Sequence, residues 1–223
     1  MSGKPGSRPE NTPEVSGLRV RQRQKRFEAM LAAAERLIQS RGYPKMTMEA
    51  IAAEAEVGVA TVYNYFRTKE QIVVELFRPY LQRSFDEAER VMTALPPKPS
   101  AGVAEILRSY RHLPEKWDHS LLRTFASVGI DSAGPVGDLI AQTDGKLRVQ
   151  IKTALKSYAK QGKIRASLNI ADATEIIFAL FNQFYYQFLV DDSARYPAVF
   201  AKFTHLLPVV FSAWESTDTS HSP

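Results

Sequence analysis

The residues best suited to chemistry lie in one short stretch, TVYNYFRTKE at positions 61–70. Tyrosine hydroxyls, an asparagine amide and a lysine ammonium can all donate hydrogen bonds to phosphate oxygens or to base edges. These groups are Tyr63, Asn64, Tyr65 and Lys69. The set is typical of nucleic-acid recognition. The catalytic motifs G-x-S-x-G, H-E-x-x-H, G-x-G-x-x-G and the Walker loop are absent, and so is cysteine.

An α-helix advances about 100° per residue, which sorts the side chains of a short helix in this stretch. Val62 and Phe66 fall in one narrow sector, and we expect that sector to be buried. Tyr63 and Tyr65 lie at its two flanks, while Asn64 points directly away from it. In a major groove the tyrosines would meet phosphates of both strands, and the Asn64 amide could pair with adenine N6 and N7.

Other helices must position this one. A helix from about Arg21 is predicted because apolar residues recur at spacings of three and four. They are Phe27, Met30, Leu31, Ala34 and Ile38. We expect Gly42 to end this helix and Thr47 to cap a second short one at its N-terminus. Thr68 begins a fourth helix, and Gln71 three residues later completes a capping box.

The rest of the chain also has helical patterns and no alternating strand pattern. Pro79 lies inside the fourth helix, where loss of the bond to the carbonyl of Glu75 predicts a kink. Further helices are expected over 102–113, 119–130, 136–161, 171–190 and 195–214. Residues 176–190, IIFALFNQFYYQFLV, are apolar around nearly the whole helix, which favours a partner subunit on one face and the core on the other.

Composition limits the remaining possibilities. The chain has 223 residues, 44% of them apolar, with no cysteine and no apolar run near the ~20 residues that span a bilayer. We therefore expect a folded cytoplasmic protein. The net charge of +5 comes from residues 1–26, and we expect residues 1–20 to form a disordered basic arm. The arm is either a contact for a polyanion such as nucleic acid or a solvated tail.

The stretch TMEAIAAEAEVGVATVYNYFRTKEQIVVELF resembles the N-terminal domain of the TetR family of bacterial transcriptional regulators. The resemblance implies operator contacts at the start of the second helix, on the recognition helix and at the start of the fourth. Those positions are Thr47, Val59, Ala60, Thr61, Tyr63, Tyr65 and Lys69, to which the helical wheel adds Asn64. Two positions depart from the family pattern, since Glu56 replaces a usual glycine in the turn and Gly58 a usual serine cap.

The resemblance also implies an all-α architecture, in which an N-terminal helix-turn-helix DNA-binding domain precedes a helical ligand-binding and dimerisation domain. We place the first domain at 21–67, the second at 68–215 and a disordered tail at 216–223. The implied protein is a homodimeric regulator, without a cofactor, that a small hydrophobic or aromatic effector releases from a palindromic DNA operator. A repressor is the usual form in the family, and the residues do not separate a repressor from an activator. A helical small-molecule-binding protein or an enzyme without operator function is the alternative.

Aromatic residues of the second domain are candidates to line the effector pocket. They are Tyr110, Trp117, Phe125, Phe178, Phe181 and Tyr185. The alternative for each of them is an ordinary core residue. His112 and His119 have no second ligand at a helical spacing, so a metal site is not expected.

Overall fold

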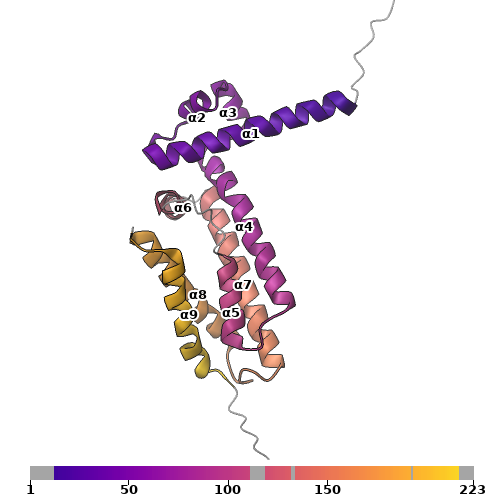
Figure 1. Ribbon diagram of the computed structural model, residues 1–223, viewed down its shortest axis with the longest axis vertical. Coiled ribbons are helices and arrows are strands. Elements are labelled where there is room, and N and C mark those ends of the chain that lie inside the picture. Colours follow the sequence, from indigo (N-terminus) through magenta and orange to yellow (C-terminus); the bar gives the residue numbers. More distant parts are fainter. Residues whose placement is uncertain (1–12, 111–118, 132–133, 192, 216–223) are drawn as a thin grey trace, which may run out of the picture. The chain divides into compact units, whose positions relative to one another are not determined.

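The computed structural model describes residues 13–110, 119–131, 134–191 and 193–215. Within these ranges the regular structure is helical apart from one isolated bridge between Ile164 and Glu215, which confirms the all-α fold class. The elements are α1 (Pro13–Arg41), the 3-10 helix η1 (Tyr43–Lys45), α2 (Met48–Glu54), α3 (Val59–Tyr65), α4 (Lys69–Thr93), α5 (Pro99–Ser109), α6 (His119–Asp131), α7 (Pro135–Lys160), α8 (Ile170–Val190) and α9 (Tyr196–Ser212) (Figure 1).

The chain forms two compact units, one up to Ile72 and the other from Val73. The division falls within α4, slightly after the boundary that we predicted at residue 67. No described helix is long and apolar enough to cross a membrane. α4 continues through Pro79 to Thr93, and the kink that we expected there stays a prediction.

The first helix is longer than the apolar pattern indicates. We expected it to begin near Arg21 and residues 1–20 to be disordered, but α1 begins at Pro13. Residues 13–20 are therefore helical, whereas residues 1–12 and 216–223 lie outside the described part of the chain. Proline is well suited to the first turn of a helix, and arginine and glutamine are good helix formers. A polar helical extension of this kind has no apolar periodicity by which to recognise it.

In the first unit, α1 supplies the long side of the core and α2 and α3 pack against it (Figure 1). Met30, Ala34 and Ile38 of α1 are buried, as the spacing predicted. Gly42 ends α1 with a φ of 78°, a conformation that glycine adopts without strain, and its N–H donates to the carbonyl of Ile38 at 2.9 Å.

The second unit contains the remainder of α4 and the helices α5 to α9, with α8 and α9 side by side (Figure 1). Its core draws on α5, α7, α8 and α9 together. The predicted helices over 136–161, 171–190 and 195–214 correspond closely to α7, α8 and α9. The one predicted over 102–113 is instead Pro99–Ser109, beginning at a proline in its first turn.

A close contact between α5 and α7 occurs at Gly102. A β-carbon at this position would overlap the hydroxyl oxygen of Tyr158 and lie 2.9 Å from the ring carbon Cζ. Tyr158 has no freedom to withdraw, because it is fully buried and its hydroxyl donates to the carbonyl of Pro96 at 2.7 Å. The two helices can approach this closely only because residue 102 lacks a side chain.

Gly102→Ala is therefore expected to lower the free energy of unfolding by about 1–3 kcal/mol, measured by denaturant titration. Adding Tyr158→Phe removes the overlapping oxygen, so the double variant should cost less than the two single changes added together. Gly145→Ala is the matched control, since nothing lies within 4 Å of a β-carbon there and the change should instead stabilise α7. Equal losses at Gly102 and Gly145 would contradict the close contact.

Candidate nucleic-acid interface

The turn between α2 and α3 has a defined backbone geometry. Thr47 caps α2 as predicted, its hydroxyl oxygen accepting from the N–H of Ala50 at 3.1 Å. At the other end, Val57 N–H donates to the carbonyl of Ala52 at 2.9 Å and Glu56 N–H to that of Ala53 at 3.3 Å. This is a Schellman C-terminal motif, which requires a left-handed residue at the position of Glu56.

Glu56 adopts that left-handed conformation, with φ at 53°. A side chain there costs about 1–2 kcal/mol relative to a right-handed residue, so the turn keeps its shape in spite of the absent glycine. The second departure from the family pattern has less effect. Gly58 is the N-cap residue of α3, in extended conformation and without a side-chain cap bond.

One face of α3 is held by the core and the opposite face is open. Val62 and Phe66 are buried, as the helical wheel predicted, and the Phe66 ring stacks on Phe27 of α1 with centroids 5.4 Å apart. The open face carries the other predicted contact residues. Val59, Ala60, Tyr63 and Asn64 are exposed, and Thr61 is half-buried. The buried pair fixes the direction in which these side chains point.

The two tyrosines of α3 have different surroundings. Tyr63 is 49% exposed, so its hydroxyl is accessible to a ligand. Tyr65 is half-buried, and its hydroxyl donates to the carbonyl of Arg23 at 3.1 Å. Its ring also lies 6.3 Å from that of Phe27, and the Arg23 guanidinium carbon is 5.8 Å from its centre. Tyr65 thus joins α3 to α1 as well as lying beside the open face.

Lys69 is held at the start of α4 by Tyr43 of η1. Its ammonium group donates to the carbonyl of Tyr43 at 3.4 Å and lies 4.1 Å from the ring centre. The Tyr43 hydroxyl donates to Glu70 Oε1 at 3.1 Å. Partial burial opposes ionisation of Glu70, but the bonds from its own N–H, Thr68 and Tyr43 keep its pKa below the ordinary value. Burial, together with Glu70, raises the pKa of Tyr43.

Gln71 caps the start of α4 in a modified way. The N–H of Gln71 donates to the Thr68 hydroxyl at 3.3 Å, as in the capping box that we predicted. Its side-chain oxygen, however, accepts from the N–H of Arg67 at 2.8 Å, one residue before the cap. These two hydrogen bonds still fix the first turn of α4. Lys69 therefore extends from an ordered helix terminus.

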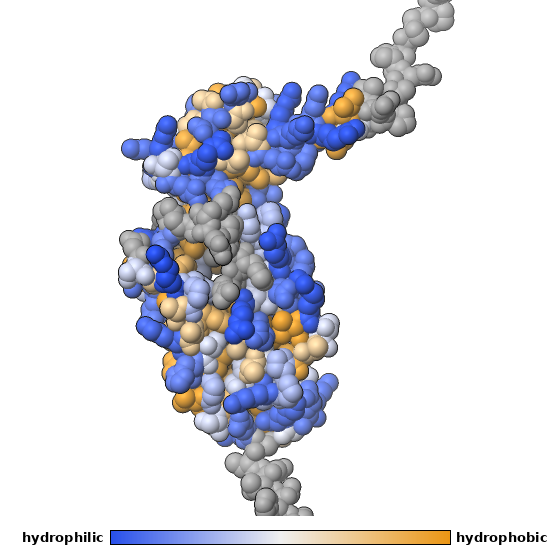
Figure 2. Space-filling view, in the orientation of Figure 1, coloured by the Kyte–Doolittle hydropathy of each residue, from blue (hydrophilic) through white to orange (hydrophobic). Residues whose placement is uncertain are grey.

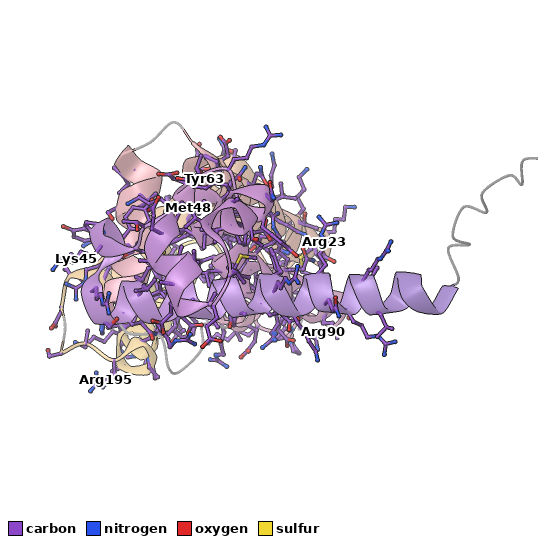
Figure 3. The ribbon with its side chains drawn as sticks, turned by 90° about the horizontal axis from the view of Figure 1, so that it is seen from above. Arg23, Lys45, Met48, Tyr63, Arg90 and Arg195 are labelled. Carbon is purple, nitrogen blue, oxygen red and sulfur yellow. The ribbon has the colours of Figure 1, made fainter. Side chains whose placement is uncertain are left out.

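Two acidic side chains near this surface have polar partners in the same unit. Glu54 forms an ion pair with Arg36 of α1 at 2.9 Å, and Glu70 accepts from Tyr43. Cationic groups lie mainly on α1, where Figure 2 shows mostly hydrophilic side chains. Figure 3, viewed from above this unit, shows Arg23 and Tyr63 on the same side of the long α1 ribbon.

The aromatic candidates for an effector pocket are distributed over the second unit. Phe178 and Phe181 are buried in its core, and Phe125 stacks on Phe77 at 4.0 Å. Tyr185 is half-exposed as a residue, but burial around its hydroxyl raises its pKa to about 12. Trp117 lies outside the described residues, as does His112.

A buried polar pair in this unit was not predicted. The hydroxyl of Tyr110 donates to Gln150 Oε1 at 2.6 Å, while Gln150 Nε2 is buried without a hydrogen-bond partner among the described residues. Gln150 is only 4% exposed. The sequence signal was a glutamine inside the apolar face of α7, beside Leu147 and Ile151. Tyr43 was missed as well, because only the fold brings it to Lys69.

The described residues contain no group of three or more His, Asp or Glu side chains arranged to hold a metal ion. His119 instead packs its ring against Phe188, with centroids 4.5 Å apart.

Parts of the sequence and the fold resemble those of known proteins. The family model for bacterial regulatory proteins of the tetR family matches residues 30–76. An uncharacterized HTH-type transcriptional regulator of Mycobacterium tuberculosis is 36% identical over 59 residues, which span 26% of this chain and only 28% of that relative. The fatty acid metabolism regulator protein of Bacillus subtilis is 25% identical over 176 residues, or 74% of this chain and 84% of the relative.

Among solved structures, SmeT, the repressor of the Stenotrophomonas maltophilia multidrug efflux pump SmeDEF, superposes with a TM-score of 0.65 at 18% identity. The superposition covers 86% of this chain and 91% of the SmeT chain. The fold and the site thus define a helix-turn-helix protein with a helical second unit. Residues 30–76 of the chain resemble the TetR family of bacterial regulatory proteins. That family consists of regulators rather than enzymes.

The strained turn gives a testable consequence for stability. Glu56→Gly is expected to raise the free energy of unfolding by about 1 kcal/mol, because glycine adopts a positive φ without steric cost. Glu56→Ala removes the same charge but keeps a β-carbon, so it should give no comparable gain. Denaturant unfolding of the three proteins measures this, and an equal gain in both variants would show that charge, not backbone strain, is responsible.

Proposed function

We propose that this chain is a cytoplasmic, homodimeric DNA-binding repressor, and that a small hydrophobic or aromatic effector releases it from an inverted-repeat operator. The observation that supports this best is the open face of α3. Its exposed Asn64 lies opposite the buried Val62 and Phe66, and the exposed Tyr63 lies at the flank. A helix held in this way by a preceding helix and tight turn is the arrangement that inserts into a major groove.

Each contact residue has a separate role in this proposal. Asn64, at the centre of the open face, reads a base edge, and Val59 and Ala60 bring apolar contacts such as those made to a thymine methyl group. Tyr63 and Thr61 bind phosphates beside the groove, and the Thr47 hydroxyl can donate to one while it accepts from Ala50. Lys69 adds a cation at the N-terminus of α4, where the helix dipole already favours an anion.

Homodimerisation would cover the apolar side chains that α8 and α9 expose in one chain. Ile176, Tyr186 and Val190 recur along one side of α8, and Leu206 and Val209 lie on α9. The two helices are adjacent, so the exposed residues can form a joint surface for the same two helices of a second copy. A two-fold dimer presents two recognition helices, which is why the operator should be an inverted repeat.

The effector site is proposed among the aromatic residues of the second unit, near the Tyr110–Gln150 pair. A buried amide N–H without a partner is costly, and a bound acceptor would satisfy it. The effector that suits this site is therefore mainly apolar and carries a hydrogen-bond acceptor. A cavity of about 450 Å³ elsewhere, between Gln187 and Lys202, contains none of the predicted aromatic residues.

The DNA-binding proposal is tested first by incubating the pure protein with fragments of genomic DNA and sequencing those that it retains. Footprinting of a retained fragment should reveal two inverted half-sites about one helical turn, or a small multiple, apart.

Tyr63→Phe should weaken binding to all sequences alike, by about 0.5–1.5 kcal/mol for a lost hydrogen bond. Asn64→Ala should instead reduce the preference at one base position by about 1–3 kcal/mol. An unchanged preference would remove Asn64 from base reading.

The dimer proposal has a matched pair of variants. Val209 on α9 is 65% exposed and Val149 on α7 is 63% exposed. A glutamate side chain would therefore be equally accessible to solvent at both positions of a single chain. Val209→Glu should convert the dimer to a monomer in analytical ultracentrifugation, because it buries a charge at the proposed interface. Val149→Glu should leave the dimer intact. Identical behaviour of the two variants would place the interface elsewhere.

A further inference from the structure

The N-terminal part of α1 is an exposed cationic helix. Residues 18–26 are all exposed, and the segment 17–26, GLRVRQRQKR, has five basic residues and no acidic one. None of the five basic groups forms an ion pair with another side chain that the structure describes. Of these five residues, only Arg19 lies in the segment 1–20 that we expected to be disordered, and all five are held on a helix that continues into the core.

The five basic residues form two separate rows along this helix. At about 100° per residue, Arg19, Arg23 and Arg26 fall within an arc of about 60°, whereas Arg21 and Lys25 lie on the opposite side. The first row continues the direction of the residues by which α1 packs into its own unit. Met30 and Leu37, both buried, fall in the same arc.

The same face of α1 therefore changes character along its length. It is apolar where α2 and α3 cover it, and it is lined with arginine where nothing in the described chain covers it. Arg23 lies at the transition, because its carbonyl accepts from the Tyr65 hydroxyl of α3 at 3.1 Å. The row of arginines thus begins beside the recognition helix and extends beyond it.

This arrangement works against local helix stability. Like charges four residues apart, such as Arg19 with Arg23 and Arg21 with Lys25, repel each other on a helix surface. Cations near a helix N-terminus also oppose the helix dipole. A face that only needed to be solvated could mix acids with bases, so the absence of any acid in this segment favours a polyanionic ligand.

We propose that Arg19, Arg23 and Arg26 form a second DNA-contacting surface, which binds backbone phosphates next to the half-site that α3 reads. The three α-carbons extend over about 10 Å of helix, and a DNA strand presents a phosphate about every 3.4 Å of its axis. A preformed helix holds these side chains in place before binding, which reduces the entropy lost on association. The surface adds affinity without adding sequence preference.

This inference rests on the proposed function, because it takes DNA as the ligand of the neighbouring α3. An anionic membrane is a weaker match, since Leu18 and Val20, the exposed large apolar side chains in the described part of this segment, provide too little apolar surface for an interfacial helix.

Two double variants compare the proposed row of arginines with the basic residues on the opposite side of the same helix. Arg19→Gln with Arg23→Gln removes two charges from the proposed row, and Arg21→Gln with Lys25→Gln removes two from the same turns on the other row. Kd is measured over a salt series with a fragment retained in the genomic selection and with a mixed-sequence duplex of roughly 40 base pairs, long enough for both half-sites and their flanks. Circular dichroism and thermal unfolding check that α1 and the packing of Tyr65 survive.

The first variant should flatten the plot of log affinity against log salt by about 0.9 for each lost phosphate contact, up to about 3.6 for the four in a dimer. The second should change the slope little, and neither should alter the preferred sequence. Arg19→Gln with Arg26→Gln, which leaves the Arg23–Tyr65 contact in place, should behave like the first.

Equal slopes in both double variants would overturn the inference, whether both match the wild type or both fall together. The first case would indicate a solvated helix and the second an effect of net charge. Normal operator binding by the wild type in either case would leave the proposed function standing. A wild type that binds neither duplex would overturn the proposed function as well. Equal affinity for the retained fragment and the mixed-sequence duplex, with the slope difference present, would support the surface without the operator.

Discussion

The packing of Val62 and Phe66 into the core of the first unit is the interaction on which the rest of the proposed interface depends. The Phe66 ring stacks on Phe27 of α1, and this contact sets the rotation of α3 about its axis. A helix of only seven residues has little stability by itself, so tertiary contacts must hold it. Because these two residues are buried, Tyr63 and Asn64 must face outward.

The surroundings of α3 show how positioning and electrostatics are shared among elements. The left-handed Glu56 adds strain to the turn, yet the hydrogen bonds of Val57 and Glu56 to α2 preserve its shape. Lys69 is held by the ring and carbonyl of Tyr43, so its ammonium group is ordered before any ligand arrives. α1 contributes in two ways. It supports α3 through Phe27, and the part of α1 that extends past α3 carries the row of arginines.

The second unit combines an apolar core with one unusual polar pair. Most of its buried residues are aliphatic or aromatic, and the amide nitrogen of Gln150, whose oxygen accepts from Tyr110, has no hydrogen-bond partner among the described residues. The apolar surface that remains exposed on α8 and α9 has a different character, because it lies on adjacent helices and can be covered by another copy of the chain. An effector site and a dimer surface in one unit would allow binding at one to influence the other.

The sequence by itself determined the fold class, the order of the helices and the buried face of α3, because helical periodicity and caps such as Thr47 and Gly42 are local properties. The family resemblance also pointed to Glu56 as an unusual residue in the turn. Only the tertiary structure decided where Tyr65 and Lys69 point, since their partners, Arg23 and Tyr43, are 42 and 26 residues away in the chain. The helical state of residues 13–20 was not predictable from apolar spacing, because a solvent-exposed helix has no buried face to produce that pattern.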